Sequence, residues 1–229
     1  MAVLISSDWH FNHQYDNEVG GILEFERGNK FSTIEKHDAY IVECVRKWIT
    51  SLKHDSDTFY FLGDFGRPTE ETFKQLKGIF YTAKCHTVAV LGNHDHSDEV
   101  LQLNELFDYV EPYPIWLSNR VVLSHQPVAV WKDQLNIHGH LHGSVLDSPN
   151  YLNANIHVAN YQPINKSKME STLSKISKRD RKFLYEPWAD MYKFTQKKED
   201  VIYDKDRKID LSATRLFHRL LEEKQCDSR

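Results

Sequence analysis

Five short apolar runs, each ending in polar residues that can bind metal ions, constrain the fold of this chain more than any other feature of its sequence. The runs read AVLISSD, DTFYFLGD, HTVAVLGNHD, RVVLSH and LNIHGH. Near-continuous apolar runs of this length predict strands that are buried on both faces of a sheet. Between them, residues 34–52, 69–80 and 97–107 show helical periodicity or helix-start signals. Strands alternating with helices predict a layered α/β fold.

Length and charge bound the organisation of the chain. Its 229 residues are 40% hydrophobic, which allows one good core. No apolar run approaches the roughly 20 residues that span a bilayer, and the N-terminus lacks the basic and long apolar regions of a signal peptide. We therefore expect a cytoplasmic protein with no membrane partner.

The charge is unevenly distributed. Residues 1–164 carry a net charge of −9, whereas residues 165–229 carry +5. We predict a core domain over 1–164 and a basic, aromatic extension over 165–229, with a last helix at about 211–224. The extension is expected to pack on the core or at a subunit interface, so that a homo-oligomer is one expected assembly.

The polar residues after the five runs are of the types that bind metal ions. They are Asp8 and His10, Asp64, the stretch Asn93-His94-Asp95, His125, and His138 with His140. Ligands bind at the carboxyl ends of the strands in α/β sheets, so we expect these side chains to lie together. Each motif alone is weak, since a single histidine is more often a bystander, but the five together favour a dinuclear metal site. Carboxylate, amide and imidazole groups without thiolates suit Mn²⁺, Fe or Zn²⁺ and disfavour a structural zinc cage.

The order of these motifs resembles the calcineurin-like metallophosphoesterase superfamily over residues 3–164, and is similar to a compact prokaryotic or phage-type member. The resemblance implies an α/β fold with a layered β-sandwich flanked by helices, followed here by a C-terminal helical extension. It implies a first metal ion held by Asp8, His10, Asp64 and His140, and a second held by Asp64, Asn93, His125 and His138. It also makes His94 the catalytic acid or hydrogen-bond donor, with Asp95 orienting its ring.

The implied reaction is metal-dependent hydrolysis of a phosphate ester by a metal-bridging hydroxide. Two cations about 3.5–4 Å apart polarise the phosphoryl oxygens and clamp an in-line displacement. We expect two Mn²⁺ ions, with Fe or Zn²⁺ as alternatives. The acidic core favours a small, nucleotide-like phosphomonoester or phosphodiester over a long polyanion.

Two other functions stay open at this point. A nuclease acting on DNA or RNA would use the basic, aromatic extension to bind the nucleic acid backbone. A catalytically silent scaffold or binding protein would keep the same fold with a vestigial site. The intact set of motifs favours the hydrolase over the scaffold.

Four further residues carry weaker predictions. His13 follows His10 by three positions and His142 extends the last motif, and both are candidate substrate contacts. For His142 a solvated loop position is an equal alternative. Trp9 is expected to pack beneath the site, and Ser97 to cap the helix over 97–107.

Overall fold

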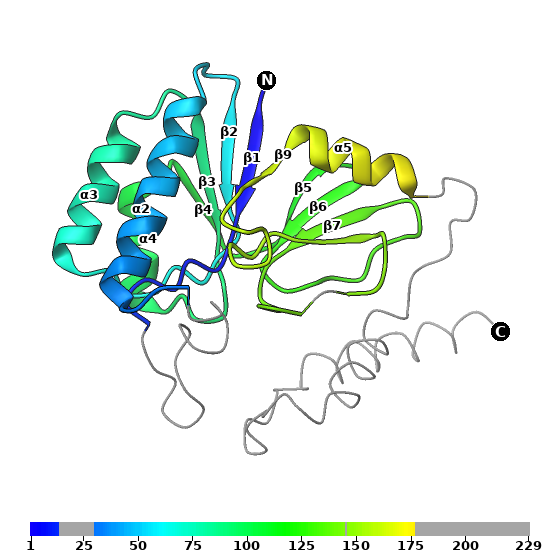
Figure 1. The fold of residues 1–229 in the computed structure, drawn as a ribbon. Helices are drawn as coiled ribbons and strands as arrows, with labels where there is room; N and C mark the ends of the chain where they lie inside the picture. Colours follow the sequence, from blue (N-terminus) through cyan, green and yellow to red (C-terminus); the bar gives the residue numbers. More distant parts are fainter. Residues whose placement is uncertain (14–29, 145, 177–229) are drawn as a thin grey trace, which may run out of the picture. The chain divides into compact units, whose positions relative to one another are not determined.

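The computed structural model describes residues 1–13, 30–144 and 146–176. All of them belong to one compact unit of the chain, Met1–Lys197. Within these ranges the chain forms two mixed sheets with helices against them (Figure 1). The predicted last helix at 211–224 and most of the basic extension lie outside the described residues.

The first sheet has the strand order β4-β3-β2-β1-β9. Strands β1 to β4 run parallel to one another and β9 pairs antiparallel to β1. The bounds are Val3–Ser6 for β1, Thr58–Phe61 for β2, His86–Val90 for β3, Tyr109–Glu111 for β4 and Ile164–Asn165 for β9.

The second sheet has the order β5-β6-β7-β8, with β5 antiparallel to β6 and the other three strands parallel. The bounds are Ile115–Ser118 for β5, Val121–Ser124 for β6, Leu135–His138 for β7 and Tyr151–Asn153 for β8. The five predicted strands are therefore β1, β2, β3, β6 and β7. The sequence did not predict β4 and β5, which are partly exposed.

Side-chain alternation along the strands divides the core into two main layers. Ile5 of β1, with Leu123 of β6 and Ile137 of β7, packs in the cluster between the two sheets. Phe59 and Phe61 of β2 face the other way, toward the helices, in a second cluster. The predicted sandwich with helices flanking it is confirmed.

Three helices cover the outer face of the first sheet (Figure 1). They are α2 (Ile34–Ser51), α3 (Glu70–Tyr81) and α4 (Ser97–Leu106). The Oγ1 atoms of Thr33 and Thr69 accept backbone N–H bonds at the first turns of α2 and α3, as N-cap residues do. The N-cap of α4 is His96, whose N–H donates to Glu99, so the prediction of Ser97 as the cap was wrong by one residue.

The last described helix, α5 (Lys166–Lys175), belongs to the predicted extension. Asn165 caps it by accepting the N–H of Lys168, and Met169 and Leu173 pack against the cluster between the sheets. The start of the extension is thus attached to the core, while the domain boundary after residue 164 stays a prediction. None of the described helices is long and apolar enough to cross a membrane.

Candidate metal centre

The candidate ligands come from both sheets. The loops after β1, β2 and β3 carry Asp8, His10, Asp64 and Asn93, and the chain after β6 and β7 carries His125, His140 and His142. In each sheet these strands are parallel, so their carboxyl ends open on the same edge, as predicted from the sequence. The site therefore joins the two layers of the sandwich.

The backbone at this edge is unusual for residues with side chains. Five candidate ligands have left-handed φ angles: Asp8 at 58°, His10 at 47°, Asp64 at 60°, His140 at 65° and His142 at 47°. Few residues other than glycine adopt this region, and aspartate and histidine are among those that tolerate it best. Such outliers concentrate at functional sites, where the surrounding structure holds them in place.

A first group of donor atoms comes from Asp8, His10, Asp64 and His142. One ligand atom of each lies within 4.8 Å of the others. His10 Nε2 is 3.5 Å from Asp64 Oδ2 and 4.0 Å from Asp8 Oδ1. The ring centroids of His10 and His142 are 5.1 Å apart. Two carboxylates and two imidazoles in this space form a ligand set that suits a divalent transition metal.

A second group comes from Asp64, His125 and His140, again within 4.8 Å of one another. His125 Nε2 is 3.3 Å from Asp64 Oδ2. The side-chain oxygen of Asn93 joins this group, at 2.9 Å from His125 Nε2 and 2.8 Å from His140 Nδ1. Asp64 is therefore shared by both groups.

The arrangement of Asp64 and His125 fits a bound cation. Nδ1 of His125 lies 2.7 Å from the carbonyl oxygen of Leu62, so Nδ1 carries a proton and Nε2 is the ring nitrogen that faces Asp64. Asp64 Oδ2 is buried and accepts no hydrogen bond from any described residue. A bound cation would displace the proton that the contact with Asp64 favours on His125 and would take its place beside the carboxylate.

Burial and charge shift the pKa values of this cluster in opposite directions. Burial disfavours the ionised form of Asp64, yet the contact with His125 and the charges of His125 and His10 hold its pKa below the ordinary value. Burial also disfavours protonated His125, but its contact with Asp64 outweighs this and raises the pKa to about 9. Burial, aided by the charge of His125, lowers the pKa of His140 to about 4, which leaves this imidazole neutral and able to bind a metal.

The last three histidines are grouped differently from the expectation. His140 lies in the second group rather than the first, and His142, expected to contact substrate, lies in the first. His138 is in neither group. Because Ile137 faces the cluster between the sheets, the next residue on β7 points to the outer face, where His138 lies near Tyr151 and its Nδ1 bonds the carbonyl oxygen of Gly139.

This difference gives a direct test. We expect His142→Ala to reduce the content of bound Mn²⁺, because it removes a member of the first group. We expect His138→Leu to keep the metal content of the wild type, because His138 lies outside both groups. Metal analysis of the two purified variants checks this, and metal loss in His138→Leu alone would restore the grouping expected from the sequence.

Two glycines let the ligand loops approach one another. A Cβ atom on Gly92 would collide with the carboxylate of Asp64, and one on Gly139 would collide with Asp8 and Ser7. The absence of a Cβ atom at Gly92 and Gly139 therefore allows the close approach of these loops.

His94 lies at the border of the first group. Its backbone N–H donates to Asp64 Oδ1 at 3.0 Å, and its half-buried ring lies 5.7 Å from that of His10 and 6.4 Å from that of His13. The rings of His10 and His13 lie 5.3 Å apart. The backbone of this loop is held by Asp38, which accepts the N–H of Asn12 at 2.8 Å. His13 is thus close to the site, and its contact with substrate stays a prediction.

Asp95 contacts backbone groups, and its expected role of orienting the ring of His94 stays a prediction. Its carboxylate accepts backbone N–H bonds from Asp64, Phe65 and Gly92, and among the described residues it makes no hydrogen bond to the ring of His94. Burial raises its pKa above the ordinary value, and the N–H groups of Gly92 and Phe65 oppose that rise.

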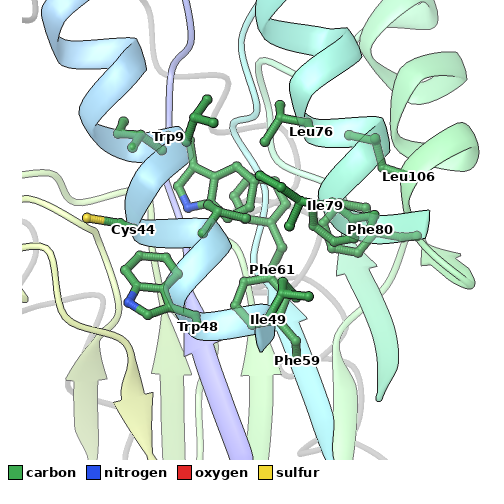
Figure 2. Packing of buried hydrophobic residues seen from close by; sticks show 14 of the residues in the cluster. Trp9, Cys44, Trp48, Ile49, Phe59, Phe61, Leu76, Ile79, Phe80 and Leu106 are labelled. Carbon is green, nitrogen blue, oxygen red and sulfur yellow. The ribbon is translucent and has the colours of Figure 1, made fainter. Parts of the chain in front are cut away.

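Trp9 anchors the first ligand loop, as predicted. Its side chain is fully buried, its ring lies 4.3 Å from that of Phe61, and its Nε1 donates to Ser6 Oγ. Figure 2 shows Trp9 packed among Phe61, Leu76 and Ile79. A fixed ring between Asp8 and His10 limits the freedom of both neighbours.

Comparison with solved structures finds proteins of similar fold. The fold is similar to that of a protein of unknown function from Aquifex aeolicus, with 22% sequence identity, coverage of 74% of this chain and 98% of that chain, and a TM-score of 0.53. A nuclease MPE from Pseudomonas putida is 17% identical, with 61% of each chain covered and a TM-score of 0.41. Comparison with curated proteins gives no match.

A family model described as calcineurin-like phosphoesterase matches residues 1–211. It spans both sheets and every candidate ligand. The resemblance noted in the sequence motifs is thereby confirmed, and this protein belongs to the calcineurin-like phosphoesterase family.

Proposed function

We propose that this protein hydrolyses a small, nucleotide-like phosphate ester with two divalent metal ions. Its family and its His/Asp cluster indicate metal-dependent phosphoester hydrolysis in general terms. The observation that carries the proposal is the pair of overlapping ligand groups that share Asp64. The carboxylate of Asp64 has one oxygen that faces both groups, and two adjacent cations need such a ligand to share.

The residues present fit both ions. The first would be held by Asp8, His10, Asp64 and His142, and the second by Asp64, Asn93, His125 and His140. When bound, such a pair polarises the phosphoryl oxygens and generates a nucleophile from water at neutral pH. We propose Mn²⁺ as the native metal, with Fe or Zn²⁺ as alternatives that the same ligands accept.

The protein itself supplies the group that assists the leaving oxygen. The N–H bond from His94 to Asp64 fixes the backbone beside the shared ligand, and leaves the imidazole free to reach a phosphate at the cluster. From there the ring donates a hydrogen bond to the developing negative charge or a proton to the leaving alkoxide. His13, on the neighbouring loop, is a second candidate for contact with the phosphate.

The substrate class rests on charge. Residues 1–164 have a net charge of −9, which disfavours a long polyanion and favours a compact ester bound chiefly through the metals. A nuclease is the second candidate, because the extension after residue 164 carries +5 and could supply a basic track.

The test is a substrate screen on metal-depleted protein. After dialysis against a chelator we expect no turnover, and addition of Mn²⁺ is expected to restore it. The screen compares an aryl phosphate, a bis-aryl phosphate, nucleoside monophosphates, cyclic nucleotides and single-stranded DNA. Turnover of DNA alone would establish the nuclease, whereas binding of two Mn²⁺ ions without turnover of any ester would favour a scaffold protein.

A further inference from the structure

Asp95 is a buried carboxylate that contacts the loop of the shared ligand rather than a side chain of the site. Its Oδ2 accepts the N–H of Asp64 at 2.9 Å and that of Gly92 at 2.7 Å, and its Oδ1 accepts the N–H of Phe65 at 2.8 Å. The side chain is 8% exposed. Both oxygens are thus occupied by backbone donors from the loops after β2 and β3.

The backbone of Asp64 explains why an anion fits there. Gly63 and Asp64 both have positive φ angles, of 85° and 60°. Turns that include left-handed residues direct successive N–H groups toward one side, where they form a concavity that binds an anion. The N–H groups of Asp64 and Phe65 converge in this way on the carboxylate of Asp95. Bonds from N–H groups to an ionised acceptor are about twice as strong as neutral ones.

We propose that Asp95 is a positioning residue for Asp64, which holds the shared ligand in its left-handed conformation and so sets the affinity of the site for metal ions. The inference rests on the proposed function, because it takes Asp64 as the ligand common to both ions. It differs from the role expected from the sequence, in which Asp95 acts on the ring of His94.

A second buried acid on the same segment provides a matched control. Glu99 is 2% exposed, its Oε1 contacts Arg67 Nε at 2.5 Å, and its Oε2 accepts the N–H of His96 at 3.1 Å. It therefore resembles Asp95 in burial and in bonding to the loop after β2. Within the described part of the chain, neither of these contacts is with a candidate ligand, so its loss affects stability without loosening Asp64.

The experiment measures Mn²⁺ binding by calorimetry together with thermal melting of the metal-free protein. We expect Asp95→Asn to weaken Mn²⁺ binding by about 10–100-fold, the range for loss of a group that orients a metal ligand. We expect Glu99→Gln to lower the melting temperature but keep the wild-type affinity. Wild-type affinity in Asp95→Asn would overturn the inference, as would an equal loss of affinity in Glu99→Gln.

A double variant separates the two roles of Asp95. If Asp95 acts through Asp64, the loss of Mn²⁺ affinity caused by Asp95→Asn is expected in the His94→Ala background as well. If Asp95 acts only through His94, Asp95→Asn would leave metal binding intact and have no further effect on turnover once the ring is gone.

Two outcomes cover the remaining cases. If Asp95→Asn does not fold, Asp95→Ser takes its place, because serine is smaller and also removes the charge. Wild-type Mn²⁺ affinity in Asp95→Ser would refute the positioning role. A wild-type protein that binds no Mn²⁺, Fe or Zn²⁺ would overturn the proposed function and this inference together, whereas unchanged affinity in the variants overturns the inference alone.

Discussion

Replacing Asp64 with asparagine is expected to abolish hydrolysis and to reduce the metal content of both sites. The carboxylate oxygen Oδ2 faces His10 Nε2 at 3.5 Å and His125 Nε2 at 3.3 Å, so a single group serves both ligand sets. Asparagine keeps the size of the side chain and removes its charge. We expect metal affinity to fall by more than the ~10–100-fold that loss of an orienting partner costs.

Metal analysis and turnover of an aryl phosphate measure this effect in the same preparation. Asp98→Asn is the matched control, because Asp98 is an exposed acid on the first turn of α4 and belongs to neither ligand group. It is expected to retain both activity and metal. Full activity in Asp64→Asn would disprove a centre in which two ions share this residue.

Replacing His94 with alanine is expected to lower kcat by about 10²–10³-fold while both metal ions stay bound. The reason is that His94 contacts Asp64 through its backbone N–H, which alanine retains, while the ring that assists the leaving group is lost. The loss of rate should be larger for phenyl phosphate than for 4-nitrophenyl phosphate, because the better leaving group needs less help from a proton donor.

His86→Ala serves as the control for this second variant. His86 is exposed at the start of β3, at the opposite end of the strand from His94. It should behave as the wild type with both substrates. Metal loss in His94→Ala would mean that the ring itself is a ligand, and an equal effect on the two phosphates would remove its role as an acid.

The sequence predicted those parts of the fold that burial dictates. Strands β1 and β6 are buried along nearly their whole length, and such burial requires the near-continuous apolar runs that are visible in the sequence. Helices α2, α3 and α4 were predicted to within a residue or two because their caps and apolar faces are local features. Strands β4 and β5 were missed because they are short edge strands with half of their residues exposed.

The candidate site was predicted less completely. Position after a strand indicated that Asp8, Asp64 and His125 would lie together, but it did not show that His142 rather than His138 lies with them. The spacing of a motif does not show which way each side chain points. The alternation of side chains along β7 contains the information that the spacing of the motif lacks. The apolar Ile137 must face the core, so its neighbour faces away from it.

The contacts of Asp95 carry no sequence signature at all. Its partners are backbone N–H groups of Asp64, Phe65 and Gly92, and a backbone group is the same whatever residue bears it. The left-handed conformation of Asp64 is equally hidden, because the residue that adopts it is not a glycine. Both features depend on how two distant loops meet.

At the positions of the left-handed ligands, the side chain that metal binding needs lowers the stability of the folded chain. A residue with a Cβ costs roughly 1–2 kcal/mol in this conformation, and glycine at Asp8 or His10 would relieve that cost. Such a substitution would therefore raise stability at the cost of a metal ligand. Trp9 lies between Asp8 and His10 in the sequence, and its ring is buried against Phe61. This packing helps to hold both neighbours in the left-handed conformation.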